Sequence, residues 1–412
     1  MKYLLFIALI IEVIILTKYD KKVFGNYLSP IAILGYPLIF IILLSLLISK
    51  QLGFKTISDD LLLINIIGLF IMWCSSLFWS IITPNTLLSK IKNFFETSPP
   101  QNNFPLKKTI LTISWFVILI MAYSFIKTYL KFHQNINLIG TDEFIYEYSG
   151  YGIKGHILVL GIFTSIYIIG MVKKPDIITF ITLLLLIICL LIQQVKTWIY
   201  VPIISGLILK FYNNRKIKFN LISIIKFVIL IIVIFFLSYY FGAIHNKGDI
   251  TERSIAIFKH MMGYVFAGIL GFGEHIKSGL PIGEYPSHLI MPFKNLWNYL
   301  VGEEIQSVVS NYHVFIDYKQ AFDVNVKTFF GTIYIYGGFW NSIIYVFILS
   351  LLLYFLWIIS SLTKNYWLII LYAFLTSPLL LGWFDFYYNQ LTFIEIPVII
   401  LAILLLNKIY TK

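Results

Sequence analysis

LLLINIIGLFIMWCSSLFWSIIT, residues 61–83, contains no charged side chain. A helix that crosses the hydrocarbon core of a bilayer needs roughly 20 mostly apolar residues. The stretch therefore predicts a membrane span, and similar runs recur along the whole chain. We expect an all-α polytopic membrane protein with about eleven spans. The other runs are Tyr3–Thr17, Ile31–Ile48, Thr109–Leu130, Ile153–Met171, Asp176–Leu191, Trp198–Phe211, Leu221–Gly242, Asn341–Ser360, Trp367–Leu381 and Thr392–Leu406.

The composition agrees with this interpretation. Of 412 residues, 59% are hydrophobic and 12% are charged, whereas soluble domains carry roughly a quarter charged residues. The net charge of +12 would favour a nucleic-acid partner in a soluble protein, but here the lysines lie between apolar runs, as in membrane proteins. We therefore exclude nucleic-acid binding. Both cysteines, Cys74 and Cys189, lie inside apolar runs, which excludes a disulfide framework.

The first apolar run could belong to a signal peptide, but it lacks a small-residue cleavage site and contains Glu12. We therefore expect a short first helix. Seventeen basic residues fall on one side of the predicted spans and seven on the other, the remaining seven lying in 243–327. We expect a location in a bacterial inner membrane, where the positive-inside rule predicts a cytoplasmic C-terminus and an extracytoplasmic long loop. The expected domains are 1–242 (spans 1–8), 243–340 (the long loop) and 341–412 (spans 9–11).

The long loop concentrates the ionisable residues: it holds five of the seven histidines and eight of the nineteen acids. A solvated loop explains most of these charges. Within the loop, Ser254–Leu270 is mostly apolar and is expected to form an interfacial or re-entrant helix. Arg253 is one of two arginines in a lysine-rich chain, and its planar fork suits a phosphate group. No metal or nucleotide motif is present, so we expect no metal ion and no cofactor.

The most informative stretch ends this loop. Residues 325–341 read NVKTFFGTIYIYGGFWN, which is first polar and then rich in aromatic residues and glycine. Gly337 and Gly338 permit a backbone bend. Lys327 could meet an anion, and Thr328 and Tyr334 offer hydroxyl groups.

This stretch resembles the late motif of the Wzy-type O-antigen and capsular polysaccharide repeat-unit polymerases. The matching residues are Asn325, Thr328, Gly331, Tyr334 and Gly338. Tyr336 stands where that family has an acid, and Asn341 replaces its last glycine. Pro292–Gly302 is similar to the run before the motif, and Lys196-Thr197 resembles a basic pair that opens an earlier span. The layout is also similar, with a large outer loop late in the chain and two or three helices after it.

The resemblance implies a metal-independent integral membrane glycosyltransferase whose fold is similar to the C-type membrane glycosyltransferases. Its substrates would be undecaprenyl-pyrophosphate-linked oligosaccharide repeat units at the outer leaflet, which it would polymerise into O-antigen or capsular polysaccharide. A chain-length regulator and a flippase are the implied protein partners.

This activity assigns expected roles to residues of the loop. A pyrophosphate leaving group requires cations, for which Arg253, Lys196 and Lys327 are the candidates. The acceptor hydroxyl requires a base, for which His260 and His313 lead, with Glu303 or Glu304 next. Thr328, Tyr334, Tyr264 and Trp297 are the candidates for sugar contacts, although interfacial anchoring also explains the aromatic residues.

Two other functions are alternatives to a polymerase. An O-antigen ligase would use the same donor with a different acceptor. A lipid-linked oligosaccharide flippase or other transporter would be expected to have short loops and two related halves, and we find neither in the sequence.

Overall fold

The structure is a computed structural model that describes residues 1–96, 106–133, 141–149, 152–172, 175–193, 196–214, 250–307 and 312–410. The chain divides into two units. Unit 1 comprises Met1–Glu96 and Lys259–Lys412, and unit 2 comprises Thr97–Phe258. The predicted span Leu221–Gly242 lies outside the described residues.

Apolar helices dominate both units. Among the described residues, five helices are long and apolar enough to cross a membrane: α2 (Pro30–Ile48), α3 (Asp59–Ile82), α5 (Lys107–Phe132), α7 (Ile153–Met171) and α13 (Phe329–Thr363). Shorter apolar helices are α8 (Ile177–Ile192), α9 (Lys196–Asn214), α14 (Tyr366–Leu380) and α15 (Thr392–Tyr410). Large apolar side chains such as Phe70 and Leu119 remain exposed on the long helices, as lipid-facing residues do. The protein is therefore an all-α, membrane-embedded protein.

The first helix extends beyond the apolar run Tyr3–Thr17 that predicted it. Helix α1 spans Lys2–Phe24 and ends at Gly25, whose φ of 83° is left-handed. It continues through Asp20, which is fully buried. The Asp20 carboxylate accepts hydrogen bonds from the Ser76 hydroxyl at 2.5 Å and from the Tyr354 hydroxyl at 2.6 Å. Two hydroxyl donors from α3 and α13 thus compensate for burying this acid.

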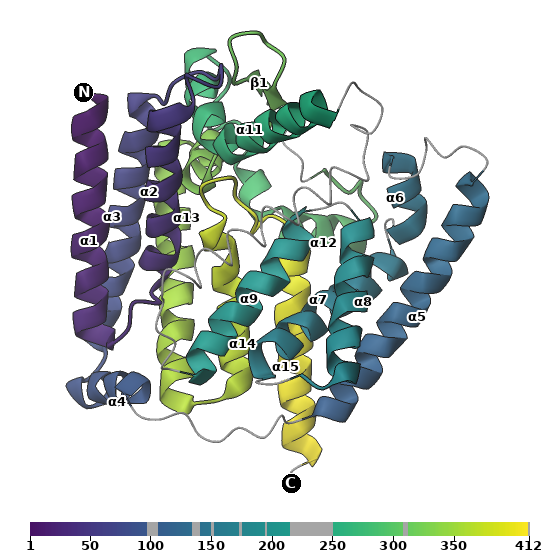
Figure 1. The fold of residues 1–412 in the computed structure, drawn as a ribbon. Helices are drawn as coiled ribbons and strands as arrows, with labels where there is room; N and C mark the ends of the chain where they lie inside the picture. Colours follow the sequence, from purple (N-terminus) through teal and green to yellow (C-terminus); the bar gives the residue numbers. More distant parts are fainter. Residues whose placement is uncertain are drawn as a thin grey trace. The chain divides into compact units, whose positions relative to one another are not determined.

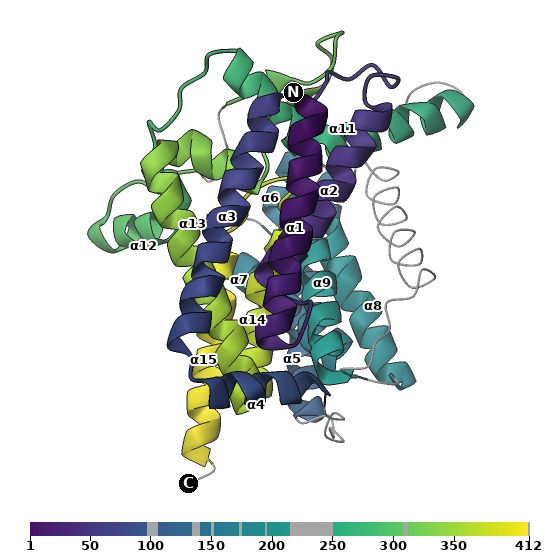
Figure 2. The same ribbon diagram turned by 90° about the vertical axis from the view of Figure 1, so that its left-hand side faces the viewer.

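In unit 1, α13 packs against α3 and α14, while α1 packs against α2 and α3. The serines that precede α2 and α3 begin these helices, because Ser29 and Ser58 accept hydrogen bonds from backbone N–H groups of the first turn. The amphipathic helix α4 (Asn85–Glu96) contacts α1 and α13, and lies across the end of unit 1 where α1 finishes (Figures 1 and 2).

The opposite end of unit 1 carries most of its non-spanning chain, and we call it the loop end. It contains the connections 49–58 and 381–391, α11 (Ile250–Lys277) from Lys259 onward, the short helix η3 (Pro286–Ile290) and α12 (Met291–Val301). Strands β1 (Val314–Phe315) and β2 (Asp323–Val324) pair antiparallel. Backbone hydrogen bonds join these parts, including one of 2.8 Å from Lys55 N–H to the Ile316 carbonyl.

Helix α13 starts at Phe329, twelve residues before the expected start of the span at Asn341, and is broken at Gly338 (φ 67°, ψ −173°). The Ser342 hydroxyl donates to the Ile333 carbonyl across the break at 2.9 Å. Nine residues of straight helix would separate these positions by about 13 Å, so the segment before Gly338 folds back sharply. The bend that the glycine pair permitted is thus present.

Unit 2 is built around α7, which packs against α5, α8 and α9; α6 (Asp142–Ser149) packs against α5. Small residues allow α7 and α9 to approach closely. A Cβ on Gly206 would lie 2.6 Å from Cβ of Ile169, and one on Gly170 would lie 2.3 Å from Cδ2 of Leu209. Such small-residue contacts are typical of helix pairs in membranes.

Candidate functional site

The stretch that resembles the polymerase motif is fixed at the loop end by its backbone. Thr328 is buried with a φ of 66°, and its hydroxyl caps α13 by accepting the N–H of Gly331 at 3.1 Å. The N–H groups of Thr328 and Phe329 donate to the carbonyls of Phe384 and Gly382, at 3.1 and 2.7 Å. The start of α13 is therefore joined to the α14–α15 connection.

This junction buries the cation of Lys327, whose side chain is 2% exposed. Its Nζ donates to the backbone carbonyls of Tyr312 at 3.2 Å and Val324 at 3.5 Å. Burial lowers the pKa of Lys327 to about 8, against the opposing attraction of Asp385 and Asp323. Lys327 is therefore a desolvated ammonium held by carbonyl dipoles, with two carboxylates contributing at longer range.

Asp385 supplies one of these carboxylates from the α14–α15 connection. Its Oδ1 accepts a 2.6 Å hydrogen bond from the Thr332 hydroxyl, one turn into α13. Burial raises the pKa of Asp385 to about 6, although the bonds from Thr332 and the Phe386 N–H and the charge of Lys327 all oppose this shift. Asp385 and Lys327 can thus both be charged near neutral pH.

His275, near the end of α11, provides a base in the same region. Its ring is fully buried, and Nε2 lies 3.0 Å from the Pro281 carbonyl. Because a carbonyl only accepts, this contact assigns the proton to Nε2. Nδ1 has no hydrogen-bond partner among the described residues. Burial lowers the pKa of His275, and Lys327 adds to the effect despite the Pro281 bond, so the imidazole is neutral at pH 7.

Aromatic rings extend the cluster toward the break in α13. Tyr312 meets His275 edge-on, with ring centroids 5.2 Å apart. Tyr336, which occupies the position of the acid in the polymerases, stacks on His288 at 3.8 Å. Asn389 lies 3.0 Å from Nε2 of His288, and burial lowers the pKa of His288 to about 4. We define the loop-end cluster as Lys327, Asp385, Thr332, His275, Tyr312, Tyr336, His288 and Asn389.

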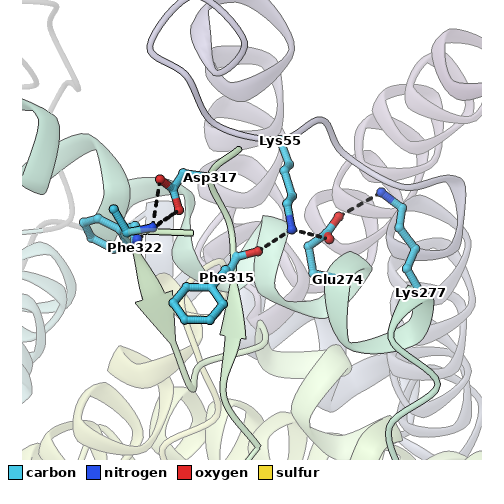
Figure 3. A network of polar contacts seen from close by, with 7 residues as sticks. Lys55, Glu274, Lys277, Phe315, Asp317 and Phe322 are labelled. Atoms are coloured by element: carbon cyan, nitrogen blue, oxygen red, sulfur yellow. Dashed lines mark hydrogen bonds and ion pairs between the residues drawn. The ribbon is translucent and has the colours of Figure 1, made fainter. Parts of the chain in front are cut away.

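A salt-bridge network secures the end of α11 (Figure 3). Lys55 Nζ bonds Glu274 Oε2 at 2.8 Å and the Phe315 carbonyl at 2.7 Å, and Lys277 bonds Glu274 Oε1 at 2.9 Å. The Asp317 carboxylate accepts the N–H of Phe322 at 2.9 Å. Since Glu274 precedes His275, this network holds the backbone that carries the imidazole. We assign it a structural role.

The predicted bases occupy different surroundings. His260 is half-buried on α11, with its ring 5.1 Å from Tyr264 and 5.3 Å from Phe322. His313 is exposed and its Nδ1 contacts the Asp323 carboxylate at 2.7 Å. Glu303 and Glu304 are exposed just after α12. The described contacts of these residues do not include Lys327 or its hydrogen-bond partners. His275, in contrast, contacts Tyr312, and the Tyr312 carbonyl accepts a hydrogen bond from Lys327.

Of the three predicted cations, Lys327 lies in the loop-end cluster. Arg253 belongs to α11 and Lys196 is the first residue of α9. The side chains of both lie outside the described part of the chain, and both residues fall within unit 2.

The four residues predicted to contact sugars also lie in different surroundings. Thr328 uses its hydroxyl as a helix cap. Tyr334 is half-buried, contacts Phe272 and lines an apolar crevice between α3 and α13. Tyr264 stacks on Phe384 at 6.1 Å. Trp297 is 64% exposed on α12.

Sequence patterns alone did not single out His275 or Asp385. His275 is one histidine among five in the loop, and its buried position follows from the tertiary fold. Asp385 does have a sequence signal, because it is an acid between aromatic residues in the short connection 381–391. No group of three or more His, Cys, Asp or Glu side chains in the described ranges could hold a metal ion.

Comparison with known proteins gives one match. A search of curated proteins finds no similar sequence, and a search of solved structures finds no similar fold. A family model described as a family of unknown function, DUF6337, matches residues 53–412. This match covers the loop end from Gly53 onward, α13 and both helices that follow. The chain therefore belongs to the DUF6337 family.

Proposed function

We propose that the protein is a membrane glycosyltransferase that polymerises undecaprenyl-pyrophosphate-linked oligosaccharide repeat units into O-antigen or capsular polysaccharide. One observation carries the proposal. The stretch that resembles the polymerase motif, Asn325–Gly338, contains a buried cation, Lys327, which two carboxylates attract at longer range. Its cluster also holds an imidazole nitrogen with no hydrogen-bond partner among the described residues. Loss of a lipid pyrophosphate requires positive charge, and attack by a sugar hydroxyl requires a base.

The reaction can be written onto these groups. The acceptor hydroxyl oxygen bonds the anomeric carbon of the growing glycan, and the bond from that carbon to the pyrophosphate oxygen breaks. The bonding pair leaves with undecaprenyl pyrophosphate, which the Lys327 ammonium stabilises. The hydroxyl proton passes to Nδ1 of His275, whose Nε2–H is held by Pro281. Asp385 keeps Lys327 protonated. In this scheme His275 replaces His260, His313 and Glu303 as the leading base.

Lys327 and His275 are both buried, so the substrate must displace a segment of the chain that covers them. The segment Ile282–Glu284 is the candidate, because it follows the Pro281 contact with His275 and Gly283 donates to the Ile335 carbonyl at 2.7 Å. Gly283 has a positive φ, and opening this bond alone leaves Pro281 on His275.

The proposal includes a topology of about eleven spans in the bacterial inner membrane, with the loop end extracytoplasmic and the C-terminus cytoplasmic. The lysine distribution supports this orientation. This orientation would place the loop-end cluster on the side of the membrane where lipid-carried sugars are found at the outer leaflet. The same proposal includes a fold similar to that of the C-type glycosyltransferases. It also includes a chain-length regulator and a flippase as protein partners. Arg253 and Lys196 remain candidate cations.

Deletion in the source strain tests the function directly. A polymerase deletion is expected to leave single repeat units on the acceptor or carrier, without a ladder of longer chains. Complete absence of surface glycan would indicate a flippase instead. Normal long chains in the deletion strain would refute the proposal, and restoration of the ladder by the wild-type gene is the matched control.

A further inference from the structure

Helix α12 has its polar side turned toward the protein. Asn298 is 4% exposed, and its Nδ2 donates to the Glu304 carbonyl at 2.8 Å. Asn295 bonds Gln306 twice, donating to its carbonyl at 2.8 Å and accepting its N–H at 2.9 Å. Lys294 donates to the Ser287 hydroxyl at 3.3 Å. The polar face is therefore satisfied internally.

The apolar side of the same helix faces outward. Tyr299 is 72% exposed and Leu300 is 69% exposed. Phe293, Leu296, Trp297 and Val301 are exposed as well. This arrangement is the reverse of a helix at the surface of a soluble domain, where the apolar stripe faces the core. A contiguous exposed patch of this kind marks a contact with a membrane or a protein.

The position of α12 favours the membrane. Helix η3 contacts both α12 and α13, and the Tyr345 hydroxyl bonds the Leu289 carbonyl at 3.1 Å. This fixes α12 beside the break in α13, and Figure 2 shows it projecting sideways from the long helices. Along α13 the exposed apolar residues continue with Phe339, Trp340, Ile344 and Ile348. Through η3, the α12 patch thus lies near the surface that α13, a membrane-embedded helix, presents to lipid.

We propose that α12 is an interfacial helix that inserts its outward face into the bilayer at the boundary between headgroups and acyl chains. Its composition suits that layer, because Trp and Tyr prefer the membrane interface and amphipathic helices lie in it with one apolar face buried. The predicted sugar residue Trp297 is then a lipid anchor. The inference does not depend on the proposed glycosyl transfer.

Spin-label accessibility tests the proposal on the full chain in lipid nanodiscs. Both native cysteines are replaced (Cys74→Ala, Cys189→Ala), and single labels are attached through Leu296→Cys or Leu300→Cys. Ile348→Cys on α13 is the lipid-facing reference, and Lys319→Cys, in the exposed β1–β2 turn, is the aqueous reference. Thermal unfolding confirms that each variant is folded.

For both α12 labels, the ratio of accessibility to oxygen over a water-soluble nickel chelate should be several-fold higher than at Lys319. It should approach the value at Ile348. Nickel accessibility equal to that at Lys319 would refute the proposal, because the face would then lie in water. Low accessibility to both reagents would also refute it, because protein would cover the face. As a second measurement, Trp297→Phe should reduce the quenching of tryptophan fluorescence by brominated lipids.

Discussion

Two carboxylates of unit 1, Asp20 and Asp385, differ in how completely the polar groups around them are satisfied. In the contact between α1, α3 and α13, both Asp20 oxygens accept hydroxyl hydrogen bonds. At the loop end, the ammonium of Lys327 has only carbonyl hydrogen-bond partners in the described part of the chain, and Nδ1 of His275 has none there. The first arrangement is closed and suits a structural role. The second leaves a charge and a lone pair available for chemistry.

The contrast predicts that substitutions around Asp20 change stability, while substitutions at the loop end change activity. Buried polar groups that lose a partner cost about 1–3 kcal/mol. Removing a buried cation also removes its desolvation cost, which offsets part of that loss.

The largest effect is expected for His275→Gln. Glutamine can still donate to the Pro281 carbonyl but has no basic nitrogen. Polymerisation of purified carrier-linked repeat units should fall by about 10²–10⁴-fold, the usual contribution of a general base, with little change in the thermal midpoint. His133→Gln, at an exposed histidine in unit 2, is the control. Activity within a factor of two of wild type in His275→Gln would remove His275 from the mechanism.

Lys327→Met should lower the same activity by about 10²–10³-fold, as expected when one group that stabilises the departing charge is removed. The free energy of unfolding should fall by no more than about 1–3 kcal/mol, because the Tyr312 and Val324 carbonyls lose a donor while the desolvation cost of the ammonium disappears. Lys319→Met, at an exposed lysine, controls for loss of charge. A loss of activity that only follows the loss of folded protein would make Lys327 a structural residue, like Asp20.

Asp20→Asn should lower the free energy of unfolding by about 1–3 kcal/mol, because one of the two hydroxyl donors loses its acceptor. The activity per folded molecule should be unchanged. Asp60→Asn, an exposed acid in the first turn of α3, should have a much smaller effect. An inactive but equally stable Asp20→Asn protein would contradict the structural role.

The smallest effect concerns pH. Asp385 gains a proton as the pH falls through about 6, and Lys327 loses its proton as the pH rises through about 8. Activity should therefore be highest between these values. Lys327→Arg, which keeps its charge in alkaline solution, should move the alkaline limb upward. An alkaline limb that stays in place would show that Lys327 is not the titrating group.

The features predicted from the sequence were those that local patterns encode. Apolar runs predicted the helices, the Gly337–Gly338 pair predicted the bend, and Lys327 was singled out by its place in the motif. Asp385 and His275 were not, because they join Lys327 only when the α14–α15 connection and α11 pack against the start of α13. The extension of α1 through Asp20 was not predicted either. The hydroxyl groups that accompany this buried acid come from Ser76 and Tyr354, which are far away in the sequence.

The break at Gly338 also bears on the thickness of the membrane. Uninterrupted, the 35 residues of α13 would form a rod of about 52 Å, far longer than a hydrocarbon core of about 30 Å. Folding back the first turns leaves roughly 25 residues, or about 38 Å, which a modest tilt can accommodate. A glycine at this position thus matches the length of the helix to the bilayer and leaves the remaining turns to hold Thr332 beside Asp385.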